Sequence, residues 1–303
     1  MNPRNCISEK TISEIPDTKT LISFEEAKAH NKRVLALVRE KSCYDNLPEK
    51  IANNAKRTSL LAHLSGGSML RLKVVNSHTL QKNSVIDIGP KGYYNSPRND
   101  GIAFFGCKKK DKDKKAQVND FSIPVSKTDF LEELRGRQFM IFYDPEVDSY
   151  FIRDLGVGFG VFVRIETSTT LKDNQLINIG ESYFIVNIDK PVLKQGYSRL
   201  RVKVYGGITA GEVLYFSAAE FFNNKITIGR DKTCDVFIDD KLLSKVQASI
   251  FYSATAGWVL FDGDIEKQRP STNGTWLYPN SPIQLQNSQE FKSNSTLLKV
   301  KIV

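Results

Sequence analysis

The last third of the chain carries side chains that could together hold a phosphate group. Arg230 closes a strand-like segment and offers the forked donors of a guanidinium, which suit the oxygens of a phosphate. Ser244 supplies a hydroxyl and Lys245 a second positive charge. Thr272 and Asn273 add a further hydroxyl and an amide. A phosphorylated side chain carries about −1.5 to −2 charges and three acceptor oxygens, so its site needs such donors converging from different loops.

Two glycines frame these candidate residues. Gly229 comes directly before Arg230 and Gly274 directly after Asn273, where they would let the backbone turn tightly under the donors. Taken singly these motifs are weak, because Asn273 followed by Gly274 is also the usual signal of a hairpin turn. It is the occurrence of all of them in order that favours phosphate binding.

The segments around these residues predict a β-sandwich. From Met69 onward, short β-branched and aromatic segments alternate with Gly, Asn, Asp and Ser, as they do in all-β sandwiches. The expected strands include residues 70–75, 138–144, 149–155, 199–205, 225–230 and 296–303.

A helical arm is expected ahead of the sandwich. Residues 1–20 are polar and predict an extended tail. Ser23 and Glu26 form a capping box, which starts a helix that ends near residue 41. A second helix is expected from near residue 46 to residue 64, because Pro48 suits a first helical turn.

We interpret the β region as two copies of one domain, shifted by about 130 residues. The matching segments are 70–75 with 200–205, 104–107 with 227–230, 119–123 with 234–238, 138–143 with 247–252, and 150–154 with 258–262. Where the spacing differs, the extra residues fall in predicted loops, at 108–117 in the first copy and 263–270 in the second.

The second copy resembles the forkhead-associated (FHA) domain, a β-sandwich that binds phosphothreonine peptides. The resemblance covers roughly residues 197–303. It is carried by Gly229-Arg230, Ser244-Lys245 and Thr272-Asn273-Gly274-Thr275. It implies that Arg230, Ser244, Lys245 and Thr272 hold the phosphate, that Asn273 binds the peptide backbone beside the phosphothreonine, and that Gly229, Gln247 and Gly274 support the site.

The sequence departs from the family pattern at three places. Gln247 stands where the family usually has a histidine that braces the loops, and a glutamine can still form hydrogen bonds. Lys245 replaces the commoner arginine, which keeps the charge and loses the fork. The loop before Ser271 is longer than usual, so the mouth of the site is expected to be reshaped.

The first copy resembles an FHA domain that has lost its ligands. Cys107 stands at the position of Arg230, and Arg135 lies near the position of Ser244. Gly158-Phe159-Gly160 takes the place of Thr272-Asn273-Gly274. The lysine-rich loop at 108–115 is interpreted as a solvated loop.

An enzyme is not expected. The stretch DLGVGFGVFV (154–163) has the spacing GxGxG instead of GxGxxG, and no HRD or DFG string accompanies it. Its place in the repeat makes it a strand connection. The histidines (His30, His63 and His78) all lie outside the loops of the repeat, so those loops offer no histidine that could act as a general acid or base. The four cysteines form no CxxC pair, so we expect neither a metal site nor a cofactor.

The composition of the chain indicates which kinds of partner and which location to expect. The net charge of +9 favours acidic partners, but the basic loop lacks interleaved aromatic residues, which makes nucleic acid the least favoured of them. No apolar run is long enough to span a bilayer, the amino-terminal stretch has no signal-peptide core, and the cysteines are scattered. These features predict an intracellular, cytoplasmic protein, with a cytoskeletal, ciliary or nuclear location left open.

The sequence therefore predicts a mainly β protein made of two tandem FHA-type sandwiches. Residues 1–67 would be a tail and two helices, 68–190 a degenerate FHA-like sandwich, and 191–303 an FHA domain. The predicted function is non-enzymatic, phosphothreonine-dependent protein binding by an adaptor or scaffold. The alternative is a structural component of a large cytoskeletal or ciliary assembly that uses both sandwiches and the arm as docking surfaces.

Overall fold

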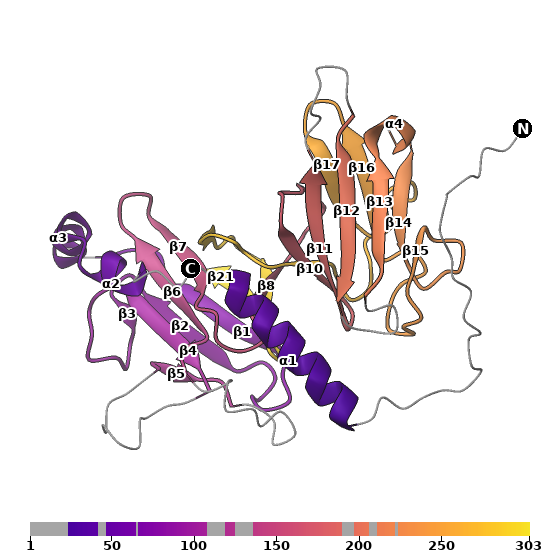
Figure 1. Cartoon of the computed structure of the whole chain (residues 1–303). Coiled ribbons are helices and arrows are strands. Elements are labelled where there is room, and N and C mark those ends of the chain that lie inside the picture. Colours follow the sequence, from indigo (N-terminus) through magenta and orange to yellow (C-terminus); the bar gives the residue numbers. More distant parts are fainter. Residues whose placement is uncertain are drawn as a thin grey trace, which may run out of the picture.

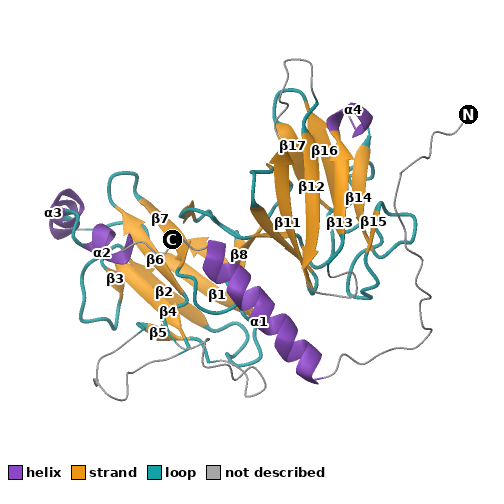
Figure 2. Cartoon of the chain, in the orientation of Figure 1, coloured by secondary structure: helices purple, strands orange, loops and turns teal. Residues whose placement is uncertain are grey.

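The fold is mainly β, as the alternating segments predicted (Figures 1 and 2). We analysed a computed structural model, which describes residues 24–41, 47–64, 66–107, 119–124, 136–189, 197–205, 211–221 and 224–303. The polar tail, Ser23 of the capping box, the lysine-rich loop at 108–115 and Arg135 lie outside the described residues.

Three helices precede the strands: α1 (Phe24–Lys41), α2 (Leu47–Ala52) and α3 (Ala55–His63). The prediction of one helix from near residue 46 to residue 64 was wrong, because that helix is broken at Asn53 and Asn54. The side chain of Asn54 accepts a hydrogen bond from the backbone N–H of Arg57 at 3.1 Å and caps α3. An asparagine competes with the helix for such backbone donors, so it starts a new helix here instead of continuing the old one.

The strands form two sandwiches, which we call the N-lobe and the C-lobe. The N-lobe contains β1 (Leu70–Asn76), β2 (Val85–Gly89), β3 (Gly92–Tyr93), β4 (Ile102–Gly106), β5 (Phe121–Ser122), β6 (Phe139–Asp144), β7 (Ser149–Asp154), β8 (Val161–Arg164), β19 (Ile283–Gln284), β20 (Glu290–Ser293) and β21 (Thr296–Ile302). The C-lobe contains β9 (Ser168–Thr170), β10 (Gln175–Ile179), β11 (Ser182–Asp189), β12 (Arg199–Tyr205), β13 (Val213–Ser217), β14 (Lys225–Gly229), β15 (Val236–Phe237), β16 (Ala248–Ser253), β17 (Gly257–Asp262) and β18 (Trp276–Leu277), with the short helix α4 (Ala218–Phe221).

One sheet runs through both lobes. Its eleven strands are ordered β13-β12-β11-β10-β18-β8-β20-β21-β1-β2-β3, and the lobes meet where β18 pairs with β8. A second sheet covers each lobe, ordered β19-β7-β6-β4-β5 in the N-lobe and β15-β14-β16-β17-β9 in the C-lobe. Each lobe is therefore a two-layer sandwich with its own apolar core.

The C-lobe is inserted into the N-lobe. It is one continuous run of strands, β9 to β18, whereas the N-lobe resumes only with β19 and ends at β21, near the C-terminal end of the chain (Figure 1). Phe291 and Leu298 accordingly lie in the same core as Leu70 and Phe139. Phe184, which precedes the predicted boundary at 190, lies in the same core as Trp258. Each sandwich therefore takes strands from both sequence repeats. The predicted boundary at residues 190 and 191 concerns where the two repeats meet in the sequence, and it stays a prediction.

The two lobes use the same strand register. Phe105 pairs with Phe139 between β4 and β6, and Ile228 pairs with Ala248 between β14 and β16. These are the pairs that the alignment of 104–107 with 227–230 and of 138–143 with 247–252 makes equivalent. The two repeats exchange strands reciprocally. In the N-lobe, β1 of the first repeat pairs with β21 of the second, and in the C-lobe, β12 of the second repeat pairs with β11 of the first.

Helix α1 covers the junction between the lobes (Figure 1). Its Val34, Leu37 and Val38 are buried in one cluster with side chains from both lobes. Those side chains are Phe162, Leu176, Ile185, Trp276 and Tyr278. These apolar side chains of α1 therefore pack on the shared sheet.

The glycine-rich stretch 154–163 connects β7 to β8, as its place in the repeat predicted. The buried carboxylate of Asp154 accepts hydrogen bonds from the N–H groups of Gly156 and Val161, each at 2.7 Å. It also accepts one from the hydroxyl of Tyr278 at 2.8 Å. Burial nevertheless raises the pKa of Asp154 to about 6, because the surroundings solvate the charged form less well than water does.

This raised pKa predicts a pH dependence of stability. The folded chain binds the Asp154 proton more tightly than the unfolded chain, so the stabilisation is complete below about pH 4 and is lost as the pH rises through about 6. The loss amounts to about 3 kcal/mol of unfolding free energy. Urea unfolding of the wild type and of Asp154→Asn at pH 4 to 7 measures it, and parallel curves for the two proteins would refute the assignment.

Candidate phosphate-binding pocket

The five candidate residues lie together at one end of the C-lobe. Arg230 directly follows β14, Ser244 and Lys245 lie between β15 and β16, and Thr272 and Asn273 lie between β17 and β18. All five line a single pocket of about 530 Å³. The structure thus brings together residues that are far apart in the sequence.

Gly229 sets the position of Arg230. A Cβ atom at residue 229 would lie 2.1 Å from the carbonyl oxygen of Lys245, so only glycine allows these two backbone segments to approach so closely. The backbone N–H of Arg230 donates to the backbone carbonyl oxygen of Ser244 at 3.2 Å. Its Nε donates to the oxygen of Leu243 at 2.7 Å. Among the described residues, the two Nη groups of Arg230 have no protein acceptor and remain available to a ligand.

Ser244 and Thr272 form the second part of the pocket. The hydroxyl of Ser244 accepts a hydrogen bond from the N–H of Thr272 at 3.1 Å and donates weakly to its hydroxyl at 3.5 Å. Asn273 donates from Nδ2 to the oxygen of Leu242 at 2.6 Å, which leaves its Oδ1 for another donor. The Oδ1 atom could accept an N–H from a peptide backbone, the role that the resemblance implies for Asn273.

Gln247 joins the two loops that carry these residues. Its side chain is fully buried and its Oε1 accepts from the N–H of Ser244 at 2.9 Å. Its Nε2 donates to the hydroxyl of Ser271 at 2.6 Å and to the oxygen of Gly274 at 3.0 Å. The side-chain amide of Gln247 therefore forms hydrogen bonds with both loops. It is buried behind the pocket surface, which is the position expected of a residue that braces the loops.

Several supporting residues were missed by the sequence reasoning. Oδ1 of Asp262 accepts hydrogen bonds from the hydroxyls of Ser271 at 2.6 Å and Thr275 at 2.8 Å, and burial raises the pKa of this carboxyl. The repeat held a signal for it, because Asp262 aligns with Asp154 at the end of the equivalent strand. Asp154 likewise supports the connection that follows its strand, through the N–H groups of Gly156 and Val161.

The N-lobe also contributes a residue to the support of the pocket. Arg164 on β8 donates to the oxygen of Ser271 at 3.5 Å and forms an ion pair with Glu290 at 2.9 Å. Gly274 has a φ of +77°, and a Cβ atom there would lie 2.6 Å from Nε of Arg164. The left-handed backbone favours glycine at this position, and a larger residue would also displace the side chain of Arg164. No sequence signal could have found Arg164, since it reaches the pocket only through the pairing of β8 with β18.

The corresponding positions of the N-lobe differ in chemistry. Cys107 is half-buried, and its carbonyl oxygen accepts from the hydroxyl of Ser122 at 3.4 Å. Phe159 packs beside the cluster under α1, and its N–H donates to Asn294 at 3.4 Å. Arg135 lies outside the described residues. The structure therefore does not bring a set of donors like that of the C-lobe together from these described positions.

The pocket is strongly basic. Five cationic side chains line it, with a single carboxylate, Asp264. The cations are Arg230, Lys241, Lys245, Lys267 and Arg269. Three of these, Lys241, Lys267 and Arg269, were not among the predicted residues.

Comparison with known families agrees with the fold. Residues 226–298 match the family model of the FHA domain, so the chain contains an FHA domain. FHA domains are phosphopeptide-binding interaction modules without catalytic activity. The match runs from β14 through β18 in the C-lobe to β21 in the N-lobe, and so spans strands of both lobes. No curated protein matches the chain.

Two further properties concern membranes and metals. None of the helices in the described ranges is both long and apolar enough to cross a membrane. In the same ranges, no three His, Cys, Asp or Glu side chains gather as a metal ion would require.

Proposed function

We propose that this protein is a phosphothreonine-dependent adaptor that binds partner proteins through the pocket of its C-lobe. One observation carries the proposal: Arg230, Ser244, Lys245, Thr272 and Asn273 line the same cavity. A guanidinium with two free Nη groups, an ammonium and two hydroxyls match the charge and the three acceptor oxygens of a phosphorylated threonine.

The N-lobe acts as a scaffold in this proposal. We infer that it is a degenerate FHA copy, which is supported by its strand register and by the replacement of Arg230 with Cys107. Its Arg164 and α1 would hold the pocket loops in place without touching the phosphopeptide. The chain as a whole is proposed to be a binding protein and not an enzyme. We also propose an intracellular location, which the scattered cysteines support because such thiols would remain reduced there.

The alternative is a structural component of a large assembly. It is favoured by the edge strand β13, on which Tyr215 is 67% exposed and Val213 39% exposed. An exposed apolar sheet edge can pair with another chain. Binding that does not depend on phosphate would favour this alternative over the adaptor.

The test is fluorescence-polarisation binding of the full chain to a peptide library. Each peptide is prepared in a phosphothreonine, a phosphoserine and an unmodified form. We expect phosphothreonine peptides to bind roughly tenfold or more tightly than the unmodified ones, because hydrogen bonds to a charged group are the strong ones. If no sequence in the library binds in a phosphate-dependent way, the proposed function is wrong.

A further inference from the structure

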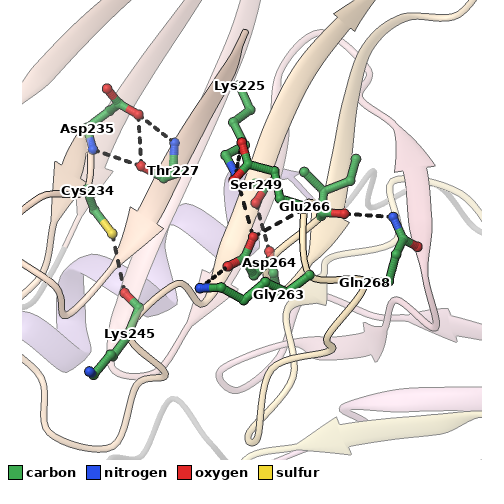
Figure 3. Close-up of polar contacts among 12 residues, drawn as sticks. Lys225, Thr227, Cys234, Asp235, Lys245, Ser249, Gly263, Asp264, Glu266 and Gln268 are labelled. Atoms are coloured by element: carbon green, nitrogen blue, oxygen red, sulfur yellow. Dashed lines mark hydrogen bonds and ion pairs between the residues drawn. The ribbon is translucent and has the colours of Figure 1, made fainter.

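The 263–270 loop forms one wall of the pocket. Polar contacts hold this loop in a defined conformation (Figure 3). Asp264 and Arg269 exchange backbone hydrogen bonds of 2.9 and 3.1 Å, which close the loop on itself. The hydroxyl of Ser249 donates to the oxygen of Gly263 at 2.8 Å, and Gln268 donates to the oxygen of Ile265 at 2.7 Å. This is the loop whose extra length was expected to reshape the mouth of the site.

The acidic side chains of this loop are already compensated. Lys225 approaches Asp264 at 3.6 Å and Glu266 at 2.8 Å, and Lys267 forms a second ion pair with Asp264 at 3.0 Å. Burial alone would raise the pKa of Asp264, but the hydrogen bond from Lys267 and the charges of both lysines hold that pKa below its ordinary value. Asp264 is therefore ionised, and it leaves little negative charge for the other cations of the pocket.

Arg269 has no such partner. Among the residues that the structure describes, its guanidinium forms no hydrogen bond and no ion pair, and the ammonium groups of Lys241 and Lys245 form none either. Arg230 adds a further cation with two free donor groups. The nearby carboxylate of Asp231 interacts electrostatically with Lys245 and Arg230, and a phosphothreonine would bring only about −1.5 to −2 further charges. Part of the positive charge, that of Arg269 included, would therefore remain uncompensated.

The size of the pocket agrees with a larger ligand. Its volume of about 530 Å³ falls in the range of sites that hold whole small molecules, and one phosphate group would leave much of it empty. Arg269 and Lys267 line it from the 263–270 loop, which is a different loop from those that carry Arg230 and Ser244. A second anionic group could therefore be held without displacing the first.

We propose that Arg269 forms a second anion subsite, and that the ligand is a phosphothreonine peptide with a second negatively charged side chain near the phosphothreonine. This inference rests on the proposed function, since it extends the same pocket. The second group is a carboxylate or a phosphate, and both are recognised by the forked donors of an arginine.

The experiment uses the full chain and one neutral phosphothreonine peptide. In a positional scan, an aspartate or a phosphoserine replaces each flanking residue in turn, and fluorescence polarisation gives the dissociation constant. We expect a gain of about fivefold or more at one or two adjacent positions, larger for phosphate than for carboxylate if the natural group is a phosphate. The aspartate and phosphoserine arms thus distinguish the two sources of the charge.

The assignment to Arg269 is tested by the ratio of two dissociation constants, that of the neutral peptide over that of the best doubly charged peptide. Arg269→Gln is expected to bring this ratio close to one. Lys301→Gln removes the same charge from an exposed position on β21 in the N-lobe and should keep the ratio.

Two failures are distinguishable. If no phosphothreonine peptide binds, the proposed function fails. If the neutral phosphothreonine peptide binds but no position shows a gain, or if the gain survives in Arg269→Gln, the second subsite is overturned while the proposed function stands.

Discussion

Arg230→Ala is expected to weaken phosphothreonine-peptide binding by roughly 30- to 1,000-fold, which corresponds to about 2–4 kcal/mol. The alanine removes the guanidinium that the hydrogen bond to Leu243 holds at the pocket, and with it the forked donors that we propose bind the phosphate. Isothermal titration calorimetry on the full chain measures the loss. Since the side chain of Arg230 is exposed, the thermal unfolding midpoint should change little.

Two further variants sharpen this prediction. Arg230→Lys keeps the charge but loses the fork and the hydrogen bond from Nε to Leu243, so its affinity should fall between those of the wild type and Arg230→Ala. Lys232→Ala removes an exposed cation of the same loop that does not line the pocket, and it should change the affinity by less than about threefold. Equal losses in Arg230→Ala and Lys232→Ala would mean that general charge, and not a phosphate contact, attracts the peptide.

The second large effect concerns the exchanged strands. Arg71 on β1 lies opposite Lys301 on β21, although the two are far apart in the sequence. Residues directly opposite each other in an antiparallel pair have Cα atoms about 4.5–5.5 Å apart, which suits a disulfide. In a chain whose native cysteines are replaced by serine, Arg71→Cys with Lys301→Cys is therefore expected to oxidise almost completely.

The matched control is Arg201→Cys with Lys301→Cys. Residue 201 is the repeat equivalent of residue 71, and it would lie opposite residue 301 if each repeat closed its own sandwich. In the structure Arg201 pairs with Asn187 instead, so this second pair should stay reduced. Non-reducing electrophoresis with peptide mapping reads out both pairs. Oxidation of the control pair in place of the first would overturn the inserted arrangement of the C-lobe.

The alternating segments were enough to predict the strands, because a half-buried strand must alternate its side chains between core and solvent. They could not predict which copy of a strand each lobe would use. Residues 183–188 and 297–302 carry nearly the same apolar pattern, so either segment satisfies the core of either lobe. Which of the two segments completes a given sandwich depends on how the strands pair in three dimensions, and the linear pattern of apolar residues carries no information on that pairing.

The residues of the pocket likewise fall into those that the sequence could predict and those that it could not. Arg230, Ser244, Lys245, Thr272 and Asn273 were identified because their chemical types and order are distinctive, and the structure places them around one cavity. Arg269 and Lys267 were missed because charged residues in a long loop are usually solvated. The backbone pairing of Asp264 with Arg269 closes that loop on itself, and no feature of the linear sequence announces this pairing. Arg164 could not be found at all, since it belongs to the other repeat.

The place of the C-lobe within the N-lobe also sets the order in which the two can be completed during translation. Every strand of the C-lobe has left the ribosome once Leu277 has emerged, whereas β1 and β7 still lack their neighbours β21 and β19. The half of the molecule that is made first is thus the last to close, and until then it exposes open sheet edges of the kind that chaperones protect. The C-lobe, by contrast, has all of its strands before synthesis ends.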